Sequence, residues 1–134
     1  MSTIISEIED DIKEIIKRAV SKIPEFKNIG IHLGTPQNFM LAFNNELPCI
    51  LVSYTSTAPY EGMYPGNLIF SVYYISYRTD RETIYRLMEN VFDKMQYITL
   101  ESLNGALRLE SDKFFYEDAD LLMFVQQWTC SKLK

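Results

Sequence analysis

Hydrophobic positions follow helical spacing in two segments of the chain and strand spacing in several others. Residues 3–23 carry apolar side chains at every third or fourth position, which predicts an amphipathic helix packed on a sheet. Ser2 or Thr3 can cap its start, and Pro24 ends it. A coiled coil would show a similar stripe and stays open as an alternative. The apolar positions are Ile5, Ile8, Ile12, Ile15, Ile16, Ala19, Val20 and Ile23.

A second amphipathic helix is predicted over residues 80–97. Thr79 and Glu82 have the spacing of a capping box, and Asp80 is an alternative cap. Glu82 and Arg86 are expected to pair across one turn on the solvent side. The apolar stripe consists of Ile84, Leu87, Met88, Val91 and Met95, with Phe92 beside it.

Strand-like segments surround this helix. Residues 47–56 and 68–77 predict an antiparallel pair, and residues 106–116 and 121–132 predict a closing hairpin after a turn at Asn104-Gly105. Both faces of 68–77 are mostly apolar or aromatic, so we expect a central strand that is covered on both sides. Residues 28–33 are expected to form a short edge strand and residues 36–43 a short helix. The expected core includes Ile12, Ile16, Val52, Val72, Leu87, Val91 and Phe124.

Together these elements predict a single α+β domain over residues 1–134. We expect a mixed or antiparallel sheet of four to five strands, with the N-terminal helix and the second long helix packed on one face. The other face would then keep Tyr, Phe, Ile and Met side chains with little chain left to shield them. Large uncovered apolar surfaces mark protein–protein contacts, so we expect self-association.

The composition of the chain limits the classes of partner and the locations that we expect. The formal charge of −5 disfavours sequence-independent nucleic-acid binding, which needs clustered Lys and Arg. No run approaches the ~18 apolar residues that a membrane-spanning helix requires. Acidic residues near the N-terminus do not fit a signal or transit peptide, so we expect assembly in the cytoplasm. Cys49 and Cys130 lie in predicted strands and should be buried, reduced thiols.

Groups suited to catalysis or to holding a cofactor are sparse. His32 is the only histidine, and a residue beside an edge strand more often has a surface role than a place in a triad. Two cysteines and one histidine give no zinc-binding spacing, and no Gly-Lys-Ser/Thr completes a phosphate loop. The acidic residues between positions 110 and 120 lack an EF-hand pattern and are expected to form a solvated hairpin tip. We therefore expect a protein that is not an enzyme and binds no cofactor or metal.

The segment 56–67 is the strongest candidate for a binding surface. It places Tyr60, Met63 and Tyr64 among prolines and glycines, and loops of this length are uncommon unless they bind something or are disordered. Tyr73 and Tyr77, on the following strand, complete the expected protein-interface residues. A passive connection between two strands is the competing interpretation.

Residues 47–54 (LPCILVSY) and 73–78 (YYISYR), followed by a capped helix and a closing hairpin, resemble small tail proteins of long-tailed bacteriophages. The pattern is most similar to the Mu-type minor tail protein group, which is related to the tail terminators. The resemblance covers residues 47–132 and is carried by hydrophobic patterns, not by catalytic motifs.

This resemblance implies a non-enzymatic protein that forms a ring, typically of six copies, at the end of the tail tube. Such a ring ends tube polymerisation and offers a surface to the head. The implied partners are further copies of the chain, the tail tube protein, and the sheath protein and a head–tail connector where these are present. The implied location is the tail of a virion or of a tail-like particle. Two alternatives stay open: another connector of the head–tail neck, and a small bacterial module that binds a protein or ligand.

Overall fold

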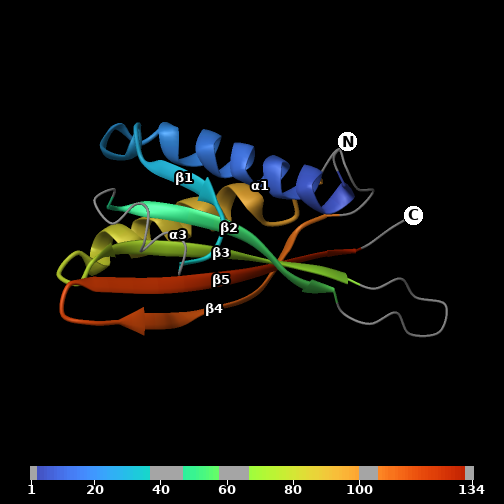
Figure 1. Ribbon diagram of the computed structural model, residues 1–134. Helices are drawn as coiled ribbons and strands as arrows, with labels where there is room; N and C mark the ends of the chain where they lie inside the picture. The colour runs from blue at the N-terminus through green and yellow to red at the C-terminus, as the bar shows by residue number, and fades with distance from the viewer. Residues whose placement is uncertain (1–2, 37–46, 58–66, 100–105, 132–134) are drawn as a thin grey trace.

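The computed structural model describes residues 3–36, 47–57, 67–99 and 106–131. In these ranges two α-helices lie on one face of a five-stranded sheet (Figure 1), which confirms the predicted α+β class. The predicted helix over 36–43 lies almost entirely outside the described residues, and the turn at Asn104-Gly105 lies wholly outside them. The helical elements are α1 (Ile4–Ser21), the short 3-10 helix η1 (Pro24–Phe26) and α3 (Arg81–Met95). The strands are β1 (Gly30–Leu33), β2 (Cys49–Thr57), β3 (Asn67–Tyr77), β4 (Arg108–Glu117) and β5 (Leu121–Ser131).

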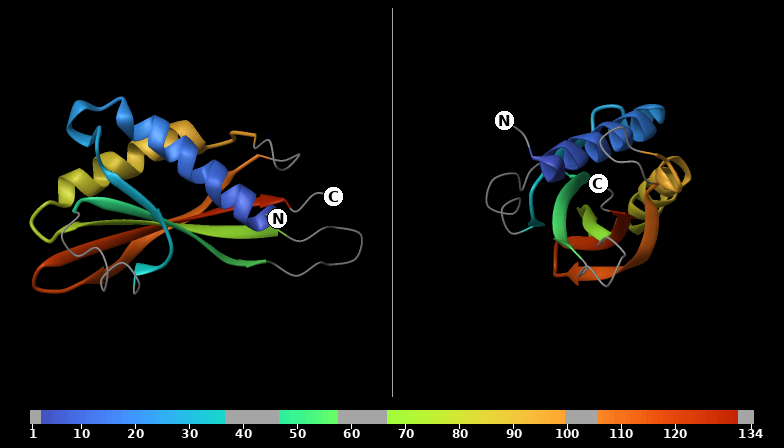
Figure 2. Two further views of the ribbon diagram at one scale, coloured as in Figure 1. Left: turned by 45° about the horizontal axis from the view of Figure 1, so that its top comes forward. Right: turned by 90° about the vertical axis from the view of Figure 1, so that its right-hand side faces the viewer.

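The sheet has the strand order β1-β2-β3-β5-β4. β1 runs parallel to β2, and the other neighbouring strands pair antiparallel. The last strand of the chain, β5, therefore lies inside the sheet between β3 and β4. β1 and β4 form the two opposite edges of a strongly twisted sheet (Figure 2).

Helix α1 begins at the predicted cap. The backbone N–H of Ser6 donates to Thr3 Oγ1 at 3.1 Å, and the Thr3 N–H donates to Ser6 Oγ at 3.0 Å, which gives a reciprocal capping box. The helix ends at Ser21, before Pro24. On its sheet side, Glu9 Oε2 accepts the backbone N–H of Tyr54 at 2.8 Å, next to the β-bulge in β2. This bond ties α1 to an irregular point of the sheet.

Helix α3 differs from the sequence-based predictions in one cap and one ion pair. Its N-cap is Asp80, the alternative cap, and not Thr79, and the Thr83 hydroxyl donates to Asp80 Oδ1 at 2.6 Å. Arg86 does not form the predicted hydrogen-bonded pair with Glu82. Both of its Nη atoms donate to the carboxylate of Glu25 in η1, each at 2.9 Å. The bidentate geometry offered by η1 is better than a one-turn pair within the helix, so the tertiary partner replaces the local one.

The main core lies between the helices and the sheet. Ile12, Ile16, Val52, Val72, Leu87 and Val91 are all buried there, as predicted. Phe124 is only half-buried at the margin of this core, so its predicted burial is wrong. Cys49 and Cys130 are buried and are not joined in a disulfide, as expected. Burial raises the pKa of the Cys130 thiol to about 11.

The opposite face of the sheet is less open than the sequence suggests. Cys49, Leu51, Ile75 and Met123 form a second cluster there, each at most 1% exposed. The half-buried side chains of Leu47, Tyr73 and Leu121 pack against this cluster. The expected apolar surface is therefore not at the centre of this face. Three consecutive exposed aromatic side chains lie instead on the edge strand β4.

Candidate functional site

The edge strand β4 exposes an unusual run of aromatic residues. Phe114, Phe115 and Tyr116 follow one another and are 52%, 47% and 39% exposed. The ladder with β5 is irregular between Phe114 and Tyr116, so the three side chains do not simply alternate between the faces. Long exposed edge strands with apolar side chains are sites where another chain can pair or pack. β4 is therefore the first candidate interaction surface.

Contacts on both sides of β4 hold these aromatic rings in place. Phe114 packs edge-on against Phe124 of β5, with ring centroids 6.0 Å apart. Phe115 packs edge-on against Tyr73 of β3 at 5.1 Å. Edge-to-face contacts at these distances are favourable aromatic geometries. Each ring is thus positioned by a neighbour while much of its surface remains exposed.

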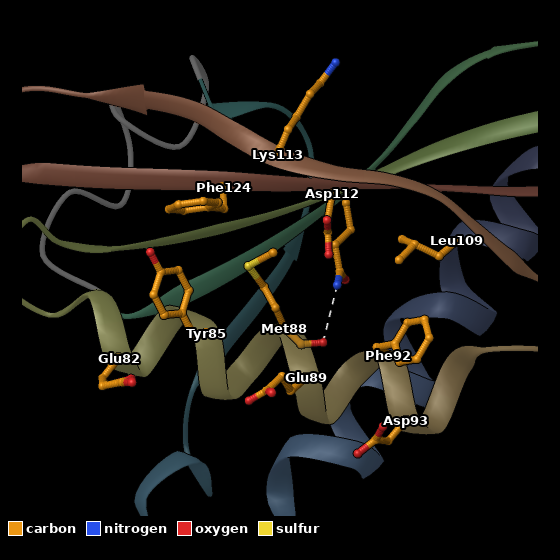
Figure 3. A pocket seen from close by; sticks show the side chains of 11 residues that line it. Glu82, Tyr85, Met88, Glu89, Phe92, Asp93, Leu109, Asp112, Lys113 and Phe124 are labelled. Carbon is orange, nitrogen blue, oxygen red and sulfur yellow. Dashed lines mark hydrogen bonds between the residues drawn. The ribbon is translucent and has the colours of Figure 1, made fainter.

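A groove separates α3 from β4 and β5 on the helix-bearing side of the sheet (Figure 3). It has a volume of about 730 Å³ and is open to solvent. Figure 3 shows Tyr85, Met88 and Phe92 projecting from α3 toward the strands, and Leu109 and Phe124 reaching it from the strand side. The groove therefore has an apolar lining that joins the exposed edge of β4.

The charged groups around this apolar lining are mostly acidic. Glu82, Glu89 and Asp93 line the groove from α3, and Asp112 lines it from β4. Lys113 is also at its margin, but its side chain points away from the helix (Figure 3). The surface consequently combines apolar area with negative charge, which suits a partner that carries apolar side chains and positive charge.

Buried hydrogen bonds fix the floor of the groove. Gln126 Nε2 donates to the backbone oxygen of Met88 at 3.3 Å, and the Tyr74 hydroxyl donates to Gln126 Oε1. Burial, with a smaller contribution from Asp112, raises the pKa of Tyr74 well above its usual value. Tyr74 is therefore a neutral donor that connects β3 to β5, while Gln126 connects β5 to α3.

The hairpin between β4 and β5 is organised by one carboxylate. Asp118 Oδ1 accepts the backbone N–H groups of Asp120 and Leu121, both at 2.8 Å, and Oδ2 accepts the Tyr116 hydroxyl at 2.9 Å. The bonds to Leu121, Asp120 and Tyr116, in that order, hold the pKa of Asp118 below its usual value. The tip is an exposed turn built on side-chain–backbone bonds, in agreement with the predicted solvated hairpin.

The structure separates the residues that were predicted as an interface. Tyr77 is 50% exposed at the end of β3, whereas Tyr73 is half-buried and packs against Phe115. Tyr60, Met63 and Tyr64 lie outside the described residues, and their role stays a prediction. The sequence interpretation missed the surface made by β4 and α3. The sequence feature that could have predicted this surface is the Phe-Phe-Tyr run of residues 114–116. It breaks the alternation expected of a strand with one solvent-facing side.

Groups with other possible chemistry are not gathered around this surface. His32 lies in β1, at the opposite edge of the sheet. Within the described ranges, no three His, Cys, Asp or Glu side chains are grouped so that they could hold a metal ion. None of the helices in those ranges is long and apolar enough to cross a membrane.

Comparison with known proteins identifies a structural neighbour. No family model matches the chain, and no curated protein matches it. Among solved structures, a chain described as "Virion of native gene transfer agent (GTA) particle" superimposes with a TM-score of 0.68. The match covers 98% of this chain and 98% of that chain, at 14% sequence identity. The two chains share a fold.

Proposed function

We propose that this protein is a structural component of a bacteriophage or phage-like particle, in which it caps the end of the tail tube as a ring. The observation that carries the proposal is the fold shared with a virion chain over 98% of both proteins. The resemblance of residues 47–132 to phage tail proteins points to the same class of particle. The proposed role is structural and requires no catalysis.

The two edges of the sheet suit assembly into a ring. β1 and β4 lie at opposite ends of the strand order, so a copy can contact one neighbour at each edge. Contacts between two different surfaces form a closed ring when the rotation between copies closes, and an open filament when it does not. The resemblance to tail terminators implies closure at six copies. The tail tube protein is the proposed partner at the face of the ring, and a head–tail connector is the proposed partner on the other side.

The test is removal of the gene from the strain that produces the particles. A tail cap sets where the tube stops, so we expect tubes of uncontrolled length without attached heads. Electron microscopy of purified particles measures tube length and head attachment. Complementation with the wild-type gene should restore a single tube length.

Labelling the particles with an antibody against the protein shows where along the tail the ring lies. The proposal requires label at the head-proximal end of the tube. Tubes of normal length with heads attached in the deletion strain, or label spread along the tube, would contradict it. Label at the neck with unchanged tube length would instead support a head–tail connector.

A further inference from the structure

We propose that the acidic, aromatic groove between α3 and β4 receives the basic α1–β1 edge of a second copy of this chain. This inference rests on the proposed ring and specifies which surfaces hold neighbouring copies together. One of the two surfaces is the groove itself, which is lined by apolar side chains and by the charged residues Glu82, Glu89, Asp93, Asp112 and Lys113.

The other surface has the opposite charge and lies on the same molecule. A shallow depression of about 420 Å³ lies between α1 and the segment that leads into β1. Its charged residues are the four cations Lys13, Lys17, Arg18 and Lys27 and the single anion Glu14. The α3–β4 groove is lined by four anions and one cation, so the two surfaces have complementary charge.

The positions of these surfaces favour contact between copies over contact within one copy. α1 packs over β1 and β2, while α3 packs over β3 and β5, so each helix turns its outer flank toward a different edge of the sheet (Figure 2). The basic surface belongs to the β1 edge and the acidic groove to the β4 edge, at the two ends of the strand order. A head-to-tail contact would bring them together in every pair of neighbours.

Apolar groups on both surfaces supply the part of the contact that charge does not. The β1 edge offers Leu33, which is 44% exposed, and half-buried Ile29. The groove offers Phe92 at 36% and Tyr85 at 37% exposure. Binding energy in an interface concentrates in a few such side chains, while charge complementarity selects the partner and its register.

Charge reversal on each surface tests the pairing. Glu89→Lys and Lys17→Glu each place like charges opposite one another, so each should lower incorporation into particles at least about tenfold. The double variant Lys17→Glu/Glu89→Lys restores opposite charges and should recover incorporation to within about threefold of wild type. Asp10→Lys is the matched control for Glu89→Lys, since it makes the same change in net charge on an exposed position of α1 that lines neither surface. It should incorporate normally.

Site-directed cross-linking locates the contact directly in assembled particles. Lys17→Cys/Glu89→Cys offers two accessible thiols, whereas the native Cys49 and Cys130 are both 0% exposed and will not compete. A short bis-maleimide linker should produce a ladder of multimers in particles, and either single cysteine variant should give no ladder.

The results separate this inference from the proposed function. If the protein sits at the tube end but the double cysteine variant gives no ladder, the interface is wrong and the capping role stands. If the ladder forms but the protein lies elsewhere in the particle, the capping role fails and the interface stands. If both single charge variants fail and the double variant also fails, while Asp10→Lys incorporates, the groove binds a different particle protein and the inference is overturned.

Discussion

Strands β3 and β4 are similar in length and both are rich in aromatic residues, yet they have opposite environments. β3 lies at the centre of the sheet between β2 and β5, with Phe70, Val72 and Tyr74 at 0% exposure. β4 lies at the edge, and its aromatic residues Phe114, Phe115 and Tyr116 are exposed. The aromatic residues of β3 are explained by the fold. Those of β4 belong to neither core cluster, and the proposed contact with a neighbouring copy would give them a role.

The largest expected difference between the two strands is their response to a charge. Val72→Asp puts a carboxylate into the core without a partner and should lower the free energy of unfolding by at least about 4 kcal/mol. That loss threatens a domain whose total margin is roughly 5–15 kcal/mol. Phe114→Asp, at an exposed position of β4, should cost no more than about 1.5 kcal/mol, mainly through the lost contact with Phe124.

Urea unfolding followed by circular dichroism measures both variants. A stable, cooperatively folded Val72→Asp protein would show that β3 is not the central strand. A Phe114→Asp protein that unfolds like Val72→Asp would show that β4 belongs to the core. The two strands would then not differ in environment.

A second expected effect concerns the buried polar bonds that link β3 to the floor of the groove. Tyr74→Phe removes the donor to Gln126 Oε1 and leaves a buried acceptor unpaired, which should cost about 1–3 kcal/mol. Tyr77→Phe, on the same strand but 50% exposed, is the control and should change stability by less than about 0.5 kcal/mol. Equal effects of the two substitutions in thermal or urea unfolding would argue against the buried network.

The smallest expected effect is a loss of stability in alkaline solution. Burial raises the pKa of Cys130 from 9.0 to about 11, so the unfolded chain releases this proton at a pH where the folded chain still holds it. Stability is therefore complete below the unfolded pKa and falls as the pH rises toward the folded one. We expect a decrease of about 1 kcal/mol between about pH 8 and about pH 9.8 from this group. Cys130→Ala should show a shallower decrease in the urea midpoint, and an identical slope would remove Cys130 as its cause.

Local patterns predicted most of the elements correctly. The isoleucine stripe of α1 and its Thr3 cap could be predicted from the sequence, because helical spacing and capping depend on residues that are close together in the chain. The two apolar faces of 68–77 likewise marked the central strand β3. The position of β5 between β3 and β4 could not be predicted from the sequence, because strand order depends on contacts between segments far apart in the chain.

The candidate site was less predictable than the fold for the same reason. Arg86 has a suitable partner one turn away in Glu82, but η1 brings Glu25 into bidentate range. The strand pattern predicts Phe124 to be a core residue, yet its side chain lines the groove and is only half-buried. The groove itself joins α3 to β4 across residues that have no shared sequence pattern. Only Tyr77 among the described interface predictions is at least half exposed.

Hydrogen exchange of the free protein and of the protein assembled in particles tests the central claim most directly, namely that β4 is an assembly surface and β3 is not. Mass spectrometry of peptides from β3 and β4 gives the protection of each strand in both states. We predict strong protection of β3 in both states, and protection of β4 that increases on assembly beyond that given by its ladder with β5. Rapid exchange of β4 in assembled particles, at the rate of the free protein, would contradict the account.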